Sequence, residues 1–177
     1  MKVLAISGSL RAGSSNAALL EAAVGLAPLG MEIVRFTELG DLPHFNPDLD
    51  GEGHEAPPAV AALRAQVSAA GGVIISSPEY AHGVPGSMKN ALDWLVSYPD
   101  FAGMPVLLWN ASAAGGQQAQ ASLVEILTTM SARVLVEASL LEPFLRRKLQ
   151  PGAELRDEDA VGAVKSSLAA LAASSKE

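Results

Sequence analysis

The stretch VLAISGSLRAGSSN, residues 3–16, joins a short apolar run to a loop with four serines, two glycines and one arginine. The apolar run has no polar alternation, which is typical of a strand buried on both faces of a parallel sheet. The loop ends at Ser14 or Ser15, either of which suits the N-cap of a helix. A strand, a polar loop and a helix in this order predict an α/β fold with a candidate site at the carboxyl end of the first strand.

The rest of the chain repeats this alternation. Short runs at 32–36, 72–76, 105–109 and 133–137 predict four further strands. Helical stretches are expected at about 15–28, 57–70, 87–97, 117–131 and 157–173. The run at 32–36 mixes polar and apolar residues, so this strand is expected nearer an edge of the sheet. Five strands and five helices with no dividing linker predict one doubly wound α/β domain over residues 1–177.

Composition excludes several classes of function. A net charge of −7 and a pI of about 4.9 argue against binding to nucleic acid or to an anionic membrane surface. The chain has no cysteine, which excludes disulfides and thiolate chemistry, and its three histidines lack metal-ligand spacing, so no metal site is predicted. No apolar run is long enough for a membrane helix, and the N-terminus predicts a strand and not a signal peptide, so the cytoplasm is the expected compartment.

The first loop has the chemistry of an anion site. A helix N-terminus presents unpaired N–H groups and a partial positive charge, and the serine hydroxyls add donors. Arg11 adds a planar fork of donors that matches a phosphate. The spacing fits neither a Walker loop nor a GxGxxG fingerprint, which favours a terminal phosphate over a pyrophosphate. A plain polar turn before a capped helix remains the alternative.

Two further loops follow the third and fourth strands. SPEYAHGVPGSMKNALDWLV, residues 77–96, begins with a Pro- and Gly-rich loop whose small residues leave room for a flat ligand. Its helix carries an apolar stripe at positions 88, 91, 92 and 95, and Lys89 and Asp93 are expected to form a solvated i, i+4 pair. Trp94 is expected to serve packing or a subunit contact, and not catalysis. NASAAGGQQAQ, residues 110–120, suits backbone contact with a ligand and equally suits a plain connection.

Together these loops resemble the NAD(P)H-dependent FMN reductase family, which includes bacterial quinone and chromate reductases. SGSLRAGSSN is similar to its phosphate loop, SPEYAHGVPGSMKNALDW to its PEY segment, and SAAGG at 112–116 to its third loop. The resemblance covers about residues 1–137. It implies a flavodoxin-like, three-layer fold with a five-stranded parallel sheet in the order 2-1-3-4-5. In that order the first and third strands are neighbours, so loops about seventy residues apart meet around one ligand.

The resemblance also implies a cofactor and the residues that hold it. The FMN phosphate is expected at Ser9, Arg11, Ser15 and Asn16. The isoalloxazine is expected at Pro78, Glu79, Tyr80, Ala81 and Gly83, and the ribityl or pyrimidine side at Ser112, Ala113 and Gly115. This chain has Ala81-His82-Gly83 where many relatives carry polar or aromatic residues, so its acceptor preference does not transfer. His82 either touches the cofactor or substrate or is a solvent-exposed loop residue.

The expected activity is transfer of electrons from NADPH or NADH through FMN to a small acceptor, such as a quinone, a metal oxyanion, an azo compound or a flavin, with ping-pong kinetics. The flavin supplies the redox chemistry, so no side chain is an obligatory acid or base; Tyr80 and His82 are candidates near the ring. The alternative is a flavodoxin-type electron carrier without NAD(P)H turnover. A receiver domain of the same fold is disfavoured, because Ser76 and Ser77 occupy the end of the third strand where it needs an aspartate. A homodimer or homotetramer is expected from the family.

Overall fold

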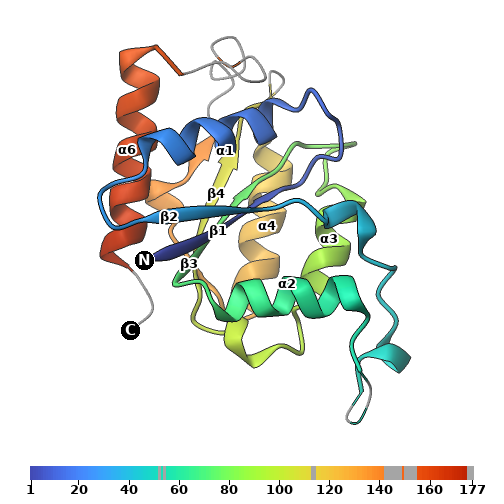
Figure 1. Cartoon of the computed structure of the whole chain (residues 1–177). Coiled ribbons are helices and arrows are strands. Elements are labelled where there is room, and N and C mark those ends of the chain that lie inside the picture. Colours follow the sequence, from blue (N-terminus) through green and yellow to red (C-terminus); the bar gives the residue numbers. More distant parts are fainter. Residues whose placement is uncertain (52, 54, 113–114, 142–148, 150–154, 175–177) are drawn as a thin grey trace.

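The computed structural model describes residues 1–51, 53, 55–112, 115–141, 149 and 155–174 (Figure 1). Its six strands are β1 (Lys2–Ser7), β2 (Glu32–Phe36), β3 (Gly72–Ser76), β4 (Pro105–Asn110), β5 (Arg133–Val134) and β6 (Leu140–Leu141). They form one parallel sheet in the order β2-β1-β3-β4-β5, and β6 also pairs with β4. The predicted α/β class and strand order are confirmed, as is the edge position of the strand at 32–36.

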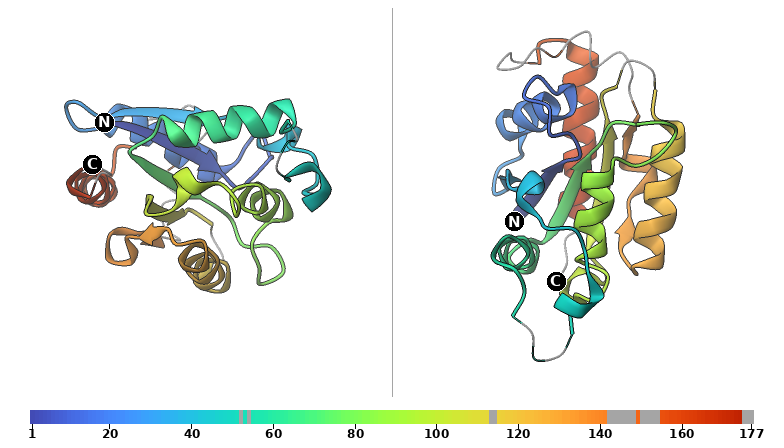
Figure 2. Two further views of the ribbon diagram at one scale, coloured as in Figure 1. Left: turned by 90° about the horizontal axis from the view of Figure 1, so that it is seen from below. Right: turned by 90° about the vertical axis from the view of Figure 1, so that its right-hand side faces the viewer.

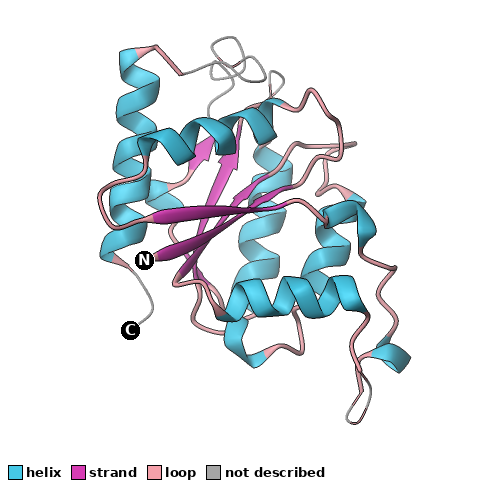
Figure 3. Cartoon of the chain, viewed as in Figure 1, coloured by secondary structure: helices cyan, strands magenta, loops and turns pink. Residues whose placement is uncertain are grey.

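Helices cover both faces of the sheet, which gives three layers (Figures 2 and 3). They are α1 (Ser15–Leu26), α2 (Pro58–Ser68), α3 (Gly86–Asp93), α4 (Gln117–Thr129) and α6 (Glu158–Ala173), with 3-10 turns η1 (Leu39–Asp41), η2 (Pro47–Leu49), η3 (Pro99–Phe101) and η4 (Val136–Ala138). Alternate residues of each central strand face opposite layers: Val3 and Ala5 pack with α1 and α6, whereas Leu4 and Ile6 pack with α2, α3 and α4. Within the described residues, no helix is long and apolar enough to cross a membrane.

The last strand departs from its expected form. The run 133–137 was expected to be one strand, but β5 ends at Val134, η4 follows, and pairing with β4 resumes at β6. Ser139 explains how the sheet tolerates the interruption. Its hydroxyl accepts from the Leu108 amide at 3.0 Å and donates to the Leu135 carbonyl at 2.9 Å. The Ser139 side chain therefore replaces the missing backbone partner of β4. Because pairing with β4 stops after β5 and resumes at β6, the sheet has six strands and not five.

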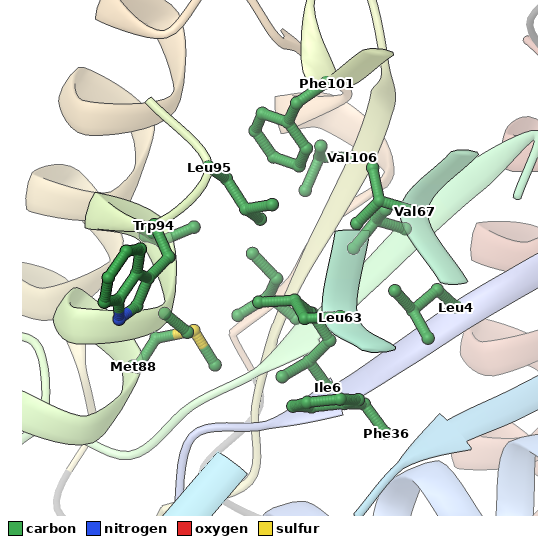
Figure 4. Packing of buried hydrophobic residues seen from close by; sticks show 14 of the residues in the cluster. Leu4, Ile6, Phe36, Leu63, Val67, Met88, Trp94, Leu95, Phe101 and Val106 are labelled. Carbon is green, nitrogen blue, oxygen red and sulfur yellow. The ribbon is translucent and has the colours of Figure 1, made fainter. Parts of the chain in front are cut away.

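Helix α3 is shorter than the predicted 87–97. It begins at Gly86 after Pro85, and it ends at Asp93 because the next turn tightens into hydrogen bonds such as Leu95 N to Leu92 O. The predicted apolar stripe and the packing role of Trp94 are confirmed, since these side chains lie in the cluster shown in Figure 4. The Lys89–Asp93 pair also forms, at 2.6 Å.

Candidate functional site

Three loops leave the sheet side by side. Ser7 of β1 pairs with Ser76 of β3, and Ser76 pairs with Trp109 of β4, so the three strands end in one row. Loop 1 (residues 8–14), loop 2 (residues 77–85) and loop 3 (residues 111–116) therefore start at the same carboxyl edge. Segments more than one hundred residues apart in sequence are thus brought together at the edge where parallel sheets bind ligands.

Loop 1 turns tightly into α1. Ser14 is the N-cap and accepts from the Ala17 amide at 3.3 Å, so the cap is Ser14 and Ser15 is the first helical residue. The Ser9 hydroxyl accepts from the Arg11 amide at 3.3 Å, which orders the loop from within. Arg11 is exposed, and among the described residues no carboxylate lies within ion-pair distance of its guanidinium. This cation is thus available to an anion at the start of α1.

Asn16 ties the bases of the three loops together. Asn16 is only 3% exposed, and its Oδ1 accepts from the Ser76 hydroxyl and from the Ala111 amide, both at 3.0 Å. One side chain of α1 therefore connects the ends of β3 and β4. Because both oxygen contacts are internal, only the amide NH2 group of Asn16 remains to donate to a ligand.

Loops 1 and 2 meet at Gly8. The Gly8 amide donates to the Ser76 carbonyl at 2.8 Å, and a Cβ at position 8 would lie 2.3 Å from Ser77 Oγ and 2.8 Å from Ser77 Cβ. No L side chain fits in that space unless one loop moves. The glycine therefore sets how closely the two loops approach.

Gly8→Ala is expected to lower the free energy of unfolding by about 1–3 kcal/mol, because overpacking forces the backbone to shift. The same shift separates loops 1 and 2, so FMN affinity should fall as well. Gly162→Ala in α6 is the matched control, since nothing lies within 4 Å of a Cβ at that position. Urea unfolding should show the control gaining about 0.5–1 kcal/mol. Equal stability of both variants would show that the approach of the loops does not depend on Gly8.

Loop 2 folds back on itself at a two-residue turn. Tyr80 and Gly83 exchange both backbone hydrogen bonds, at 3.1 and 3.0 Å, and the central residues Ala81 and His82 have φ values of 50° and 58°. This left-handed geometry normally selects Asn and Gly, so the turn is strained. The Tyr80 and His82 side chains are exposed, and Pro78 is buried. At Ala81 and Gly83 the turn has little side chain, so its backbone can lie close to a ligand beside Tyr80. This arrangement suits a planar ring.

Glu79 connects loop 2 to the helix that follows loop 3. Its Oε2 accepts from the Ala119 amide in the first turn of α4, at 2.9 Å, and its Oε1 lies 3.4 Å from His82 Nδ1. Loop 3 itself is shaped by two glycines: Gly115 has a φ of 86°, and a Cβ on Gly116 would lie 2.0 Å from Asn110 Nδ2. The Ser112 amide donates to Asn110 Oδ1 at 2.7 Å. The predicted site residue Ala113 lies outside the described residues.

The segment from Pro43 to Phe45, which follows η1, is held by α3, the helix after loop 2. The Pro43 carbonyl accepts from Asn90 Nδ2 at 2.9 Å and from Trp94 Nε1 at 2.8 Å, and the Phe45 amide donates to Asn90 Oδ1 at 2.8 Å. The Phe45 and Trp94 rings meet edge to face, with centroids 5.0 Å apart. Asn90 and the Trp94 indole N–H therefore hold Pro43 and Phe45, and the sequence pattern did not predict these particular contacts.

An ion pair holds Asp50, further along the same connection between β2 and α2. Arg64 of α2 contacts the Asp50 carboxylate at 2.6 Å and the Trp94 carbonyl at 2.7 Å, and Ser97 donates to the other Asp50 oxygen at 2.5 Å. Burial raises the pKa of Asp50, but the hydrogen bond from Ser97 and the hydrogen bond and charge of Arg64 lower it by more. The Asp50 carboxyl therefore titrates below its ordinary value of 3.8.

Asp50→Ala is expected to lower the free energy of unfolding by about 1.5–3 kcal/mol at neutral pH, as for the loss of hydrogen bonds to a charged group. A folded-state pKa below the unfolded value means that this stabilisation is present above about pH 3.8 and is lost as the pH falls through the folded pKa. Urea unfolding of both proteins across an acid pH series should show their difference shrinking. A difference that stays constant in acid would show that the charge is not its source.

A cavity of about 400 Å³ lies between loop 1 and the end of β2. Its polar lining includes Ser7, Ser9, Thr37, Arg35 and Asp41. Among the described residues, no group of three or more His, Asp or Glu side chains is placed to hold a metal ion.

The observed residues fit FMN. The N-terminus of α1, the serine hydroxyls of loop 1 and the exposed guanidinium of Arg11 suit its phosphate, and the Tyr80–Gly83 turn of loop 2 suits its ring. The three-layer fold and the three loops at the carboxyl edge define a flavodoxin-like protein whose loops suit FMN.

The family model for NADPH-dependent FMN reductase matches residues 1–144, and the chain belongs to this family. The prediction of an FMN- and NAD(P)H-dependent oxidoreductase is thereby confirmed. The chain is 36% identical to a quinone reductase of Escherichia coli K12 over 155 residues, covering 85% of this chain and 82% of the relative. It is 35% identical to an NAD(P)H-dependent FMN reductase of Pseudomonas aeruginosa over 175 residues, covering 97% and 93%.

A solved structure resembles this chain along its whole length. FerB, a flavoenzyme NAD(P)H:(acceptor) oxidoreductase from Paracoccus denitrificans, superposes with a TM-score of 0.85 at 25% identity, covering 99% of both chains.

Proposed function

We propose that this protein passes electrons from NADPH or NADH through bound FMN to a small-molecule acceptor by ping-pong kinetics. The observation that carries the proposal is the meeting of loops 1, 2 and 3 at one edge of the sheet, with the contacts of Asn16 and Glu79 between them. FMN, when bound, supplies the two-electron chemistry. The chain supplies phosphate donors in loop 1 and an exposed turn in loop 2 against which the ring can lie.

The proposed phosphate contacts are Ser9, Arg11, Ser15 and Asn16. The ring is proposed to lie against loop 2, and the ribityl or pyrimidine side against loop 3 around Ser112, Ala113 and Gly115. The exposure of Tyr80 and His82 supports a slot open to solvent on one side, where donor and acceptor enter in turn. The acceptor is proposed to be a quinone, because quinone reductases are among the relatives; metal oxyanions, azo compounds and free flavins are the other classes to assay.

Steady-state oxidation of NADH and NADPH by FMN-loaded protein tests this function. A quinone is expected to support turnover, with parallel double-reciprocal lines when both substrates are varied. Intersecting lines would contradict the ping-pong order. No oxidation of either nucleotide with any acceptor would instead support the flavodoxin-type carrier.

We further propose that residues 1–177 act as one FMN-binding domain, in the cytoplasm, as a homodimer or homotetramer. A chain without cysteine gains nothing from an oxidising compartment. Val96 is exposed beside a cavity of about 490 Å³ between the end of α3 and α4, and we place the subunit contact on this face. Light scattering after size-exclusion chromatography should give a mass of at least two chains; a single-chain mass would contradict the assembly.

A further inference from the structure

Helix α4 begins without a cap of its own. Its N-cap is Gly116, which has no side chain, and its first turn holds no acidic residue. The first turn of a helix leaves several backbone N–H groups without partners. An uncapped start next to loop 3 would leave that loop poorly held, because a side-chain cap stabilises the first turn of a helix.

Glu79 supplies the missing cap from forty positions earlier in the chain. Its Oε2 accepts from the Ala119 amide at 2.9 Å, and only 16% of its side chain is exposed. A carboxylate at this end of a helix is favoured twice, by a charge-assisted hydrogen bond and by the helix dipole. The contact joins loop 2 directly to the start of α4 and therefore to loop 3.

The second oxygen of Glu79 faces the strained turn. It lies 3.4 Å from His82 Nδ1, and the backbone of both Ala81 and His82 is in the left-handed conformation. A left-handed backbone conformation is unfavourable for any residue other than glycine, and such strain persists only where surrounding contacts hold it. Glu79 thus reaches α4 with one oxygen and the turn with the other.

We propose that Glu79 is a positioning residue that holds the loop 2 turn against α4 and, through its negative charge, lowers the reduction potential of the flavin. This inference rests on the proposed FMN site. It assigns to the Glu79 side chain a part in setting both the shape of that site and the electrostatic potential at the flavin. A negative charge beside a flavin opposes the addition of electrons, so its removal makes reduction easier.

Two variants separate geometry from charge. Glu79→Ala removes the acceptor and the charge, whereas Glu79→Gln keeps an oxygen that accepts from Ala119 but removes the charge. Glu125→Gln is the matched control, because Glu125 is an exposed acid further along the same helix. For each protein, FMN titration by fluorescence quenching measures affinity, and equilibration with reference dyes measures the midpoint potential.

Glu79→Ala is expected to weaken FMN binding by about tenfold or more, and Glu79→Gln to recover most of that loss. Both should shift the midpoint potential of bound FMN to more positive values, whereas Glu125→Gln should change neither quantity. Wild-type affinity in Glu79→Ala would overturn the positioning role, and an unshifted potential in Glu79→Gln would overturn the electrostatic role. Failure of the site itself would look different, since Arg11→Ala would then leave FMN affinity unchanged in the wild-type background.

Discussion

Arg11→Ala lowers affinity for FMN by about 10- to 150-fold, which corresponds to the loss of about 1.5–3 kcal/mol from hydrogen bonds to a charged group. Arg11 is exposed at the start of α1, so its guanidinium can donate to the phosphate. Ser9 and Ser14 order the loop without help from the Arg11 side chain. Its removal should leave the free energy of unfolding nearly unchanged. FMN titration by fluorescence quenching measures the effect.

Riboflavin provides the sharpest control, because it carries the same ring without the phosphate. Arg11→Ala should not change riboflavin affinity, and Arg11→Lys should weaken FMN binding less than Arg11→Ala because it keeps the charge but loses the fork. Arg133→Ala removes the same charge at the start of β5, on the opposite edge of the sheet, and should bind FMN as the wild type does. Equal losses for FMN and riboflavin would show that Arg11 does not hold the phosphate.

Asn16→Ala lowers the free energy of unfolding by about 2–4 kcal/mol, since each stranded buried polar group costs about 1–3 kcal/mol. The Ser76 hydroxyl and the Ala111 amide both lose their acceptor, at the point where β3 and β4 end. The loops that these strands position should loosen, so FMN affinity should fall together with stability. Urea unfolding and FMN titration on the same preparations give the two quantities.

Gln118→Ala is the control for this prediction, because Gln118 is an exposed amide in the first turn of α4. It should change stability by no more than about 0.5 kcal/mol. A loss of FMN affinity in Asn16→Ala without any loss of stability would show that the contacts of Asn16 with Ser76 and Ala111 do not stabilise the loops.

The architecture follows from local patterns that the sequence displays. Continuous apolar runs become central strands because both faces of those strands are covered, and the mixed run at 32–36 becomes the edge strand β2. The stripe through Met88, Leu92 and Leu95 is buried as its helical spacing predicts. The break after Val134 was not predictable in this way, because it depends on the Ser139 hydroxyl reaching the backbone of the neighbouring β4.

In the site, too, some features can be recognised in the sequence, whereas others depend on contacts between residues far apart in the sequence. The hydroxyls and the guanidinium of loop 1 are visible in the sequence, and so is their place at the end of the first strand. Three contacts join residues that are far apart in the sequence. The separation is 95 positions for Asn16 and Ala111, 45 for Asn90 and Phe45, and 40 for Glu79 and Ala119. No local spacing encodes such pairs, since they arise only when the sheet brings its loops to one edge.

Anaerobic mixing of FMN-loaded protein with NADH or NADPH, with no acceptor present, is the most direct test that bound FMN carries the electrons. The visible absorbance of oxidised flavin should disappear on mixing and return when a quinone is added afterwards. Persistence of the oxidised flavin spectrum in the presence of both nucleotides would contradict it.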